Sequence, residues 1–319
     1  MEKIGMRGRG SRRMGLFAAV ALTVALGLGG CSLFTPSRAD VAHEQVEAQI
    51  PADSLVQEGV LTVAFNFSDA PQGMTAADGS VTGYDADLAR LLAQDLGLEV
   101  SFVDAAGPSD ALSSGSADIY IGASSSDASS SVTVIGDLLE DAPALFCGPS
   151  VGSTISSAGL STLTVGVQSS SAAQDALTKT GLLGEQRTYG NVNECFEALA
   201  SGEVDCVACD ATAGAYLSRA YEGVTFAGIL DTASVYGVAV SSSNSSVADA
   251  LSETLDEISS NGTLDAVHAA WYGALPVTLS EDVLPGVTIS VPDEGISGDE
   301  AAQTGTMIDS DVDINDLNG

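Results

Sequence analysis

A serine-rich segment, GASSSDASSS (residues 122–131), is the stretch of the chain whose side chains could best hold a small ligand. It has six serines, one acid and no base. It lies between two apolar runs, ADIYI and VTVI, that are typical of buried strands. Hydroxyl groups and free backbone amides bind polar solutes through hydrogen bonds. Consecutive serines would also suit a flexible linker, so the surrounding elements must decide between a linker and the mouth of a binding site.

Cysteine and histidine chemistry has little support. Cys206 and Cys209 have the spacing of a redox motif, but they lie in a predicted strand rather than at a helix N-terminus, where a thiolate is stabilised. Alternation along a strand sends them to opposite faces, so they are poor partners for each other. The two histidines, His43 and His268, match no zinc motif. We therefore expect no enzyme, no cofactor and no metal site. Disulfide pairing stays open among Cys147, Cys195, Cys206 and Cys209.

The N-terminal residues 1–30 have the layout of a secretory signal peptide. A basic region is followed by the apolar run LFAAVALTVALGLGG, which is shorter than the roughly 20 residues that a membrane span needs. The segment ends in LGLGGCS, which resembles a bacterial lipobox. We expect Cys31 to be lipid-modified and to anchor the chain to the outer face of the cell membrane, with residues 31–52 as a polar tether.

The charge of the exported chain is strongly negative. Five of the 10 Lys and Arg residues and one of the 43 Asp and Glu residues lie in residues 1–30, so residues 31–319 retain 5 bases and 42 acids. This balance excludes nucleic acid as a partner, because phosphate binding needs clustered bases. It attracts cations over a Debye length of about 8 Å. Two interpretations stay open, a solvated acidic surface and a surface that selects a cationic ligand.

Predicted strands and helices alternate along the body of the chain, and the pattern occurs twice. Such alternation favours an α/β fold with parallel sheets in two lobes. The predicted strands are 60–67, 98–104, 117–122, 163–168 and 204–210, and the predicted helices are 85–97, 108–115, 170–181, 191–202, 211–220, 246–262 and 263–273.

Five segments in order resemble one family: ADGSVTGYDADLARLLAQDLG (77–97), ALSSGSADIYIG (111–122), TVGVQSSS (164–171), ALASGEVDCVACDATAGAYL (198–217) and LSETLDEISSNGTLDAVHAAWYG (251–273). They are similar to the extracellular solute-binding lipoproteins of family 3, the polar amino acid type, which serve ABC transporters. The likeness extends over nearly the whole body of the chain.

The resemblance implies a two-lobed periplasmic-binding-protein-like (type II) α/β fold with two crossing segments. After the lobes comes an acidic tail with few aromatic residues, which we expect to be disordered. The expected boundaries are residues 53–145 and 239–273 for lobe 1, 146–238 for lobe 2, 144–148 and 234–238 for the crossings, and 274–319 for the tail.

The same resemblance gives the serine-rich segment a role at the cleft. The family has hydroxyl groups and an arginine there, which hold the α-carboxylate of an amino acid. Ser124 and Ser126 fall on the hydroxyl positions, and Ser129 falls where the arginine would stand. A hydrogen bond to a charged group contributes about 1.5–3 kcal/mol, so its loss predicts roughly 10- to 100-fold weaker binding of such a ligand.

Other positions of the cleft are assigned in the same way. Gln72 stands where the family has a stacking aromatic, with Ser68 beside it. Ser170 and Ser171 open a helix whose N–H groups can face an anion, and Asp210 follows a strand, where ligands of α/β sheets bind. The resemblance implies that Asp210 pairs with an amino group. An N-cap role for Asp210 is the structural alternative, and both roles are compatible.

These features predict a lipid-anchored extracytoplasmic solute-binding protein, acting as a monomer. It would deliver a small polar solute, amino-acid-like and bearing an amine, to an ABC permease. The alternative is a surface lipoprotein whose cleft has drifted and which serves as an interaction or signalling module.

Overall fold

The computed structural model describes residues 46–181 and 184–289. Its first sheet is built around VLTVAF, which is buried at every position, as expected for a parallel strand covered on both faces. The strand order is β5-β1-β6-β13-β7. Strand β1 is parallel to β5 and β6, whereas β13 is antiparallel to β6 and β7. The bounds are β1 (Val60–Phe65), β5 (Glu99–Asp104), β6 (Ile119–Ser124), β7 (Val132–Asp141) and β13 (Ser234–Ser241).

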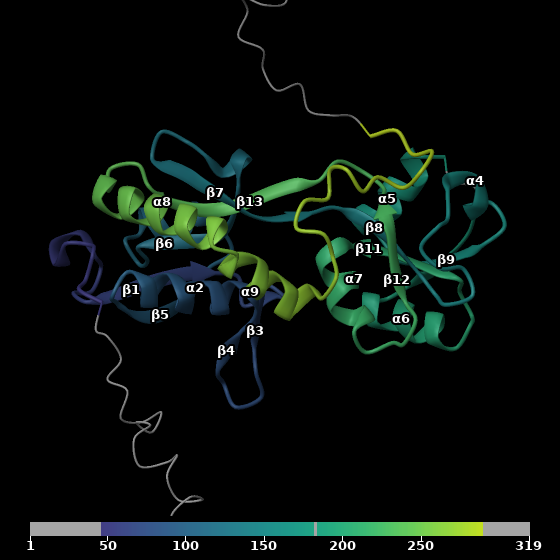
Figure 1. The fold of residues 1–319 in the computed structure, drawn as a ribbon, viewed down its shortest axis with the longest axis horizontal. Coiled ribbons are helices and arrows are strands. Elements are labelled where there is room, and N and C mark those ends of the chain that lie inside the picture. Colours follow the sequence, from purple (N-terminus) through teal and green to yellow (C-terminus); the bar gives the residue numbers. More distant parts are fainter. Residues whose placement is uncertain (1–45, 182–183, 290–319) are drawn as a thin grey trace, which may run out of the picture. The chain divides into compact units, whose positions relative to one another are not determined.

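Four helices pack on this sheet or on one another beside it. We call the sheet and these four helices lobe 1 (Figure 1). Helix α2 has an apolar face that is fully covered and packs on β1 and β5. The helices are α2 (Tyr84–Asp95), α3 (Pro108–Ser113), α8 (Ser245–Ser260) and α9 (Thr263–Tyr272).

The second sheet, with the order β10-β9-β11-β8-β12, forms lobe 2. Its strands β9, β10 and β11 are parallel, and β8 is antiparallel to β11 and β12. The strands are β8 (Pro143–Cys147), β9 (Thr164–Gln168), β10 (Glu185–Tyr189), β11 (Cys206–Asp210) and β12 (Thr225–Ile229), and the helices are α4 (Ser157–Leu160), α5 (Ala172–Lys179), α6 (Val192–Ala200) and α7 (Ala211–Ser218). The predicted α/β alternation is thus confirmed in both halves.

A small three-stranded sheet, β2-β3-β4, was not predicted. Its strands are only two or three residues long, so they carry no periodic signal. The turn between β2 (Ser68–Asp69) and β3 (Gly73–Thr75) holds Gln72 against the start of α2. A Cβ atom on Gly83 would collide with the carbonyl of Gln72, so this close approach requires glycine. The third strand is β4 (Val81–Thr82).

The chain passes between the two large sheets near Ala142 and again at residues 230–233. Strands β7 and β13 pair up to Asp141 and Ser234, and the amide of Leu230 donates to the carbonyl of Pro143 at 2.7 Å. The expected crossing at 144–148 instead falls on β8 and the residue after it, and the one at 234–238 falls within β13. The predicted crossings are displaced by a few residues because the apolar sequence runs without a break from each crossing into the adjoining strand, so the sequence does not mark the boundary.

A third connection follows α9 and corrects the expectation that all of residues 274–319 is disordered. Leu275, Leu279 and Leu284 are buried, the amide of Leu279 donates to the Glu140 carboxylate at 2.6 Å, and Val283 bridges to β12. Residues 274–289 pack on the fold despite their prolines because they bury these leucines. Most of the acids of the expected tail lie after residue 289. Residues 290–319 lie outside the described residues.

Replacing Leu284 by Ala should therefore destabilise the folded chain. Leu284 is fully buried in the core of lobe 2, and truncating such a side chain to alanine costs about 2–5 kcal/mol. Urea unfolding of Leu284→Ala measures the effect. Val277→Ala is the matched control, since Val277 is 39% exposed in the same segment; equal stability of the two variants would contradict this packing.

The end of the expected tether also contacts lobe 1. Ile50 is 3% exposed, and the backbone amide of Gln49 donates to the carbonyl of Leu96 at 3.1 Å. Cys31 and the predicted signal peptide lie outside the described residues. Within residues 46–181 and 184–289, no helix has the length and apolar character needed to cross a membrane.

The cysteine pairing is settled in lobe 2, where Cys147 on β8 and Cys206 on β11 form a disulfide. They lie directly opposite each other in the antiparallel register. Cys195 and Cys209 are free and buried. Cys206 and Cys209 belong to different core clusters, which confirms that they face opposite sides of their strand.

Candidate functional site

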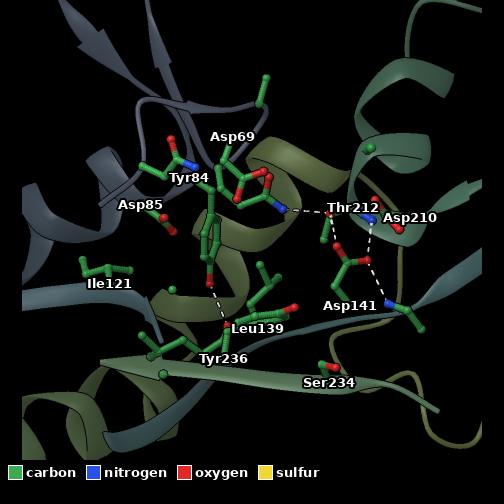
Figure 2. Close-up of a pocket in the computed structure, with 18 of the residues that line it drawn as sticks. Asp69, Tyr84, Asp85, Ile121, Leu139, Asp141, Asp210, Thr212, Ser234 and Tyr236 are labelled. Atoms are coloured by element: carbon green, nitrogen blue, oxygen red, sulfur yellow. Dashed lines mark hydrogen bonds between the residues drawn. The ribbon is translucent and has the colours of Figure 1, made fainter. Parts of the chain in front are cut away.

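A cavity of about 320 Å³ lies where residues of both lobes meet (Figure 2). Its walls come from the turn after β1, the start of α2, the ends of β6 and β7, and the start of α7. This is the location expected for a ligand in an open α/β sheet, beyond the carboxyl ends of strands. Its volume lies at the small end of the range for ligand pockets.

Four carboxylates line this cavity, and among the described residues no lysine or arginine does. Asp69 and Asp85 come from lobe 1, on β2 and at the start of α2. Asp141 ends β7 at the first crossing, and Asp210 ends β11 in lobe 2. The four basic residues of the described part of the chain are engaged elsewhere: Arg90, Lys179 and Arg187 in ion pairs, and Arg219 on the carbonyls that end α9.

Asp85 is the most buried of the four acids. Its side chain is 5% exposed, and within the described part of the chain it has neither a hydrogen-bond donor nor a cation as partner. Burial, with the nearby charge of Asp69, raises the pKa of Asp85 to about 7. A buried carboxylate without a partner is costly, so a cation beside Asp85 would stabilise the ionised form of this side chain.

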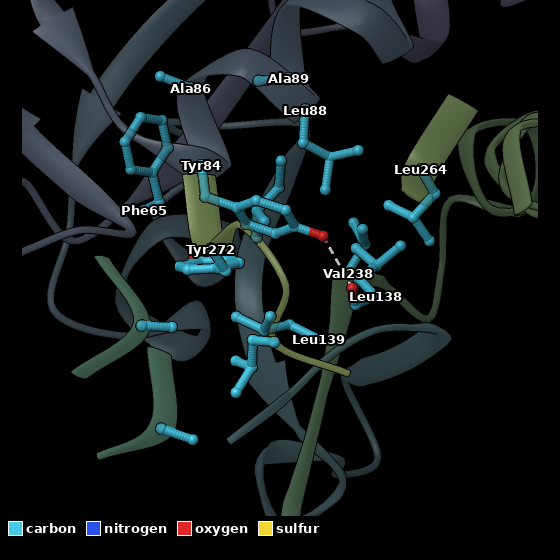
Figure 3. Close-up of a cluster of buried hydrophobic side chains, with 14 of the residues drawn as sticks. Phe65, Tyr84, Ala86, Leu88, Ala89, Leu138, Leu139, Val238, Leu264 and Tyr272 are labelled. Atoms are coloured by element: carbon cyan, nitrogen blue, oxygen red, sulfur yellow. Dashed lines mark hydrogen bonds between the residues drawn. The ribbon is translucent and has the colours of Figure 1, made fainter. Parts of the chain in front are cut away.

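The core behind Asp85 fixes its helix in place. Tyr84 precedes it, packs its ring against Tyr272 at 5.3 Å between centroids, and donates its hydroxyl to the carbonyl of Leu138 at 2.8 Å (Figure 3). Tyr84 is 1% exposed. The start of α2 therefore cannot turn Asp85 away from the cavity without breaking this packing.

Asp141 caps helix α7, which is the structural role expected for Asp210 from the sequence. One Asp141 oxygen accepts from the amides of Ala142 (2.9 Å) and Thr212 (3.2 Å), and the other accepts from the Thr212 hydroxyl at 2.6 Å. Thr212 lies in the first turn of α7, whose amides have no partner within the helix. Asp210 precedes α7 but makes no side-chain cap, and no hydrogen-bond donor in the described part of the chain contacts its carboxylate.

Burial also raises the pKa values of the other acids. It raises the pKa of Asp141 to about 7, although the Thr212 hydrogen bonds oppose the shift. The pKa of Asp210 is raised by burial and then by the charge of Asp69, and burial raises that of Asp69. Asp85 is buried and Asp141 half-buried, whereas Asp69 and Asp210 are exposed, so the four groups differ in their access to water.

A hydrogen bond joins the two lobes across the cavity. Gln72 of lobe 1 donates its side-chain amide to the Thr212 hydroxyl of lobe 2 at 2.8 Å. The Thr212 hydroxyl in turn donates a hydrogen bond to the carboxylate of Asp141 at the first crossing. Gln72, expected to occupy the position of a stacking aromatic, is thus a polar link between the lobes.

Three tyrosines complete the walls: Tyr84, Tyr120 and Tyr236. Aromatic rings attract ammonium groups through the negative potential of their faces. Acids together with tyrosines therefore favour an organic cation over a neutral or anionic solute.

The serine-rich segment does not line the cavity beyond Gly122. Ser124 donates its amide to the Asp127 carboxylate at 2.8 Å, and its hydroxyl contacts both Asp127 and Ser126. Ser129 is exposed and contacts Ser131. The chain's own Asp127 thus accepts the hydrogen bonds that were expected to hold a ligand's carboxylate. The segment is an ordered turn with a capping box, not a linker.

The remaining predicted residues have mixed positions. Asp210 and Gln72 line the cavity, and Ser68 does not. Ser170 donates its amide to the Gln174 side chain at 2.8 Å, and Ser171 caps α5 by accepting from the Gln174 amide. Neither serine lines the cavity, although Ala172 beside them does. For the ligand-binding role, Asp210 and Gln72 stay predictions.

Sequence reasoning missed Asp69, Asp141 and Thr212, and quoted Asp85 only as part of a motif. Asp69 and Asp141 each follow a strand end in the sequence, which is a usable signal. Thr212 has no such signal, because its role depends on a contact with residue 141 across the fold.

The buried acids predict an unusual dependence of stability on pH. An Asp with a folded pKa near 7 keeps its proton when the unfolded chain, with an ordinary value near 3.9, has released it. Folding stability then falls as pH rises from about 4 to about 7. Thermal melting without ligand at pH 5 and pH 8 should show a smaller loss for Asp85→Asn than for wild type. Parallel curves for the two would contradict a buried, neutral Asp85.

Residues 61–133 match the sequence model of the bacterial extracellular solute-binding proteins, family 3. A search of curated proteins found no sequence that matches the chain.

Solved structures of solute-binding proteins share the fold of this chain. A substrate-binding protein of a polar amino acid ABC uptake transporter from Streptococcus thermophilus is 18% identical, with a TM-score of 0.62 over 74% of this chain and 95% of the other. An ancestral cationic amino acid solute-binding protein is 24% identical, with a TM-score of 0.58 over 67% and 96%. The L-cystine solute receptor of Neisseria gonorrhoeae is 19% identical, with a TM-score of 0.58 over 69% and 95%.

Proposed function

We propose that this solute-binding protein captures a small, positively charged solute in the cavity and delivers it to an ABC importer. One observation carries the proposal: four carboxylates and no base of the described chain line a cavity between the lobes of a family 3 fold. A ligand there must supply the missing positive charge. Asp210 is assigned to an amine of the ligand, and Gln72 to the contact between the lobes.

The proposal includes attachment to the outer face of the cell membrane. The basic and apolar residues at the N-terminus and the lipobox-like LGLGGCS support a lipid anchor at Cys31. Family 3 proteins are extracytoplasmic, which agrees with this assignment. The chain would act as a monomer that meets its permease at the membrane surface.

A thermal-shift screen of the purified protein tests the proposal. The panel contains the twenty amino acids, small peptides, and mono- and diamines, each at millimolar concentration. A ligand at 100 times its dissociation constant adds about 2.7 kcal/mol of stability, which raises the melting temperature by roughly 5–10 °C for a protein of this size. A shift with at least one amine supports a solute receptor. A flat response to the whole panel contradicts it and favours a surface lipoprotein with a drifted cleft.

A further inference from the structure

The ligand's own charge can be inferred from what the cavity lacks. A free amino acid carries a carboxylate that needs donors, and no lysine or arginine of the described residues lines the cavity. The two groups of amides that could replace a base are partly occupied. Ser124 donates to Asp127, and Ser170 donates to Gln174. A ligand carboxylate would instead enter a space already shared by four acids.

The acids divide between the two sides of the cavity. Asp69 and Asp85 come from lobe 1, whereas Asp210 comes from lobe 2 and Asp141 from the crossing beside it. Asp141 already accepts three hydrogen bonds. For Asp69, Asp85 and Asp210, no hydrogen-bond donor is found in the described part of the chain. Each side thus presents at least one carboxylate without a partner (Figure 2).

Asp85 is the independent sign that the acids form a binding site. Its side chain lines the cavity while being 95% shielded from solvent, as its 5% exposure shows. The desolvation cost of burying an ionised carboxylate here is offset only when a positively charged partner binds beside it. Acids whose only role is to keep the protein soluble would instead be exposed to solvent.

A metal ion does not fit this arrangement. Among the described residues, no group of three or more His, Cys, Asp or Glu side chains is arranged to hold one. The four carboxylates that line the cavity come from four different elements, β2, α2, β7 and β11. A cation of organic size, with apolar carbons against Tyr84, Tyr120 and Tyr236, fits better.

We infer that the ligand is an aliphatic diamine without a carboxylate, held with one ammonium group toward Asp69 and Asp85 and the other toward Asp210. This inference rests on the proposed function and names its substrate class. The diamine would bridge the lobes beside the Gln72–Thr212 hydrogen bond, so that binding and contact between the lobes favour each other.

Isothermal titration calorimetry with matched probes tests the inference. Lysine differs from 1,5-diaminopentane by its α-carboxylate alone, and pentylamine lacks the second amine. We expect 1,5-diaminopentane to bind at least about 100-fold more tightly than lysine and at least about tenfold more tightly than pentylamine. Lysine binding as tightly as the diamine would overturn the inference and leave the proposed receptor function intact. If the diamine does not bind but an amino acid raises the melting temperature in the thermal screen, the inference is likewise overturned and the proposed receptor function stands.

Asp210→Asn and Asp249→Asn form a matched pair of variants. Both remove one negative charge, but Asp249 is exposed on α8, away from the cavity. Asp210 is also exposed and makes no cap, so its replacement should leave the fold intact, as circular dichroism can verify. We expect Asp210→Asn to weaken diamine binding at least about tenfold and Asp249→Asn to change it less than twofold. Equal effects would mean that only the overall charge attracts the diamine, which overturns the assigned site.

Discussion

Replacing Asp85 by Asn is expected to weaken binding of 1,5-diaminopentane at least about 100-fold. Asp85 is buried, and its carboxylate has no hydrogen-bond donor or cation as partner among the described residues, so an ammonium group beside it would form a largely desolvated ion pair. Removing one member of such a pair costs about 3–5 kcal/mol, which corresponds to more than 100-fold in affinity. Calorimetry at pH 8, where the carboxylate of Asp85 is mostly ionised, measures the loss.

The control for Asp85→Asn is the nearby surface acid Asp137, which is exposed on β7 and absent from the cavity. Asp137→Asn should bind the diamine within about twofold of wild type, because a surface charge contributes little. If Asp85→Asn also binds like wild type, the buried carboxylate is not part of the site. The diamine assignment to lobe 1 would then be wrong.

Removing the disulfide should cause the largest loss of stability. Cys147 and Cys206 are separated by 59 residues, and a cross-link over a loop of that length stabilises a fold by about 4 kcal/mol through the entropy of the unfolded chain. Both cysteines are fully buried, so Cys147→Ala with Cys206→Ala avoids a buried polar group. We expect the melting temperature to fall by roughly 8–16 °C.

A reducing agent serves as the control for the disulfide. It should lower the melting temperature of the wild-type protein toward that of the double variant and leave the variant unchanged. Insensitivity of the wild type, together with an unchanged melting temperature in the variant, would contradict the pairing. The buried thiols of Cys195 and Cys209 are present in both proteins, so their reactivity cancels in the comparison.

Much of the fold could be predicted because its signals are local. The apolar run of β1 and the amphipathic period of α2 are read within a single element, and both elements are present in the structure. The segment from Leu275 to Leu284 was mispredicted for the same reason. Its prolines and acids are local features, whereas the surface of lobe 2 that buries its leucines is distant in sequence.

The candidate site was predicted less well, because its chemistry depends on distant pairs. The sequence identified Asp210 after a strand, but only the contact of Asp141 with Thr212 explains why Asp210 has no capping role. The serines were expected at the cleft on the basis of composition and resemblance. Their hydroxyls instead serve their own turn, since Asp127 lies three residues after Ser124 and reaches its amide.

The most direct measurement is a crystal structure of the protein with bound 1,5-diaminopentane. We expect density for the diamine in the cavity, with one nitrogen within hydrogen-bond distance of Asp85 or Asp69 and the other within hydrogen-bond distance of Asp210. A diamine found elsewhere, or an empty cavity at saturating concentration, would contradict the claim that these carboxylates recognise the solute.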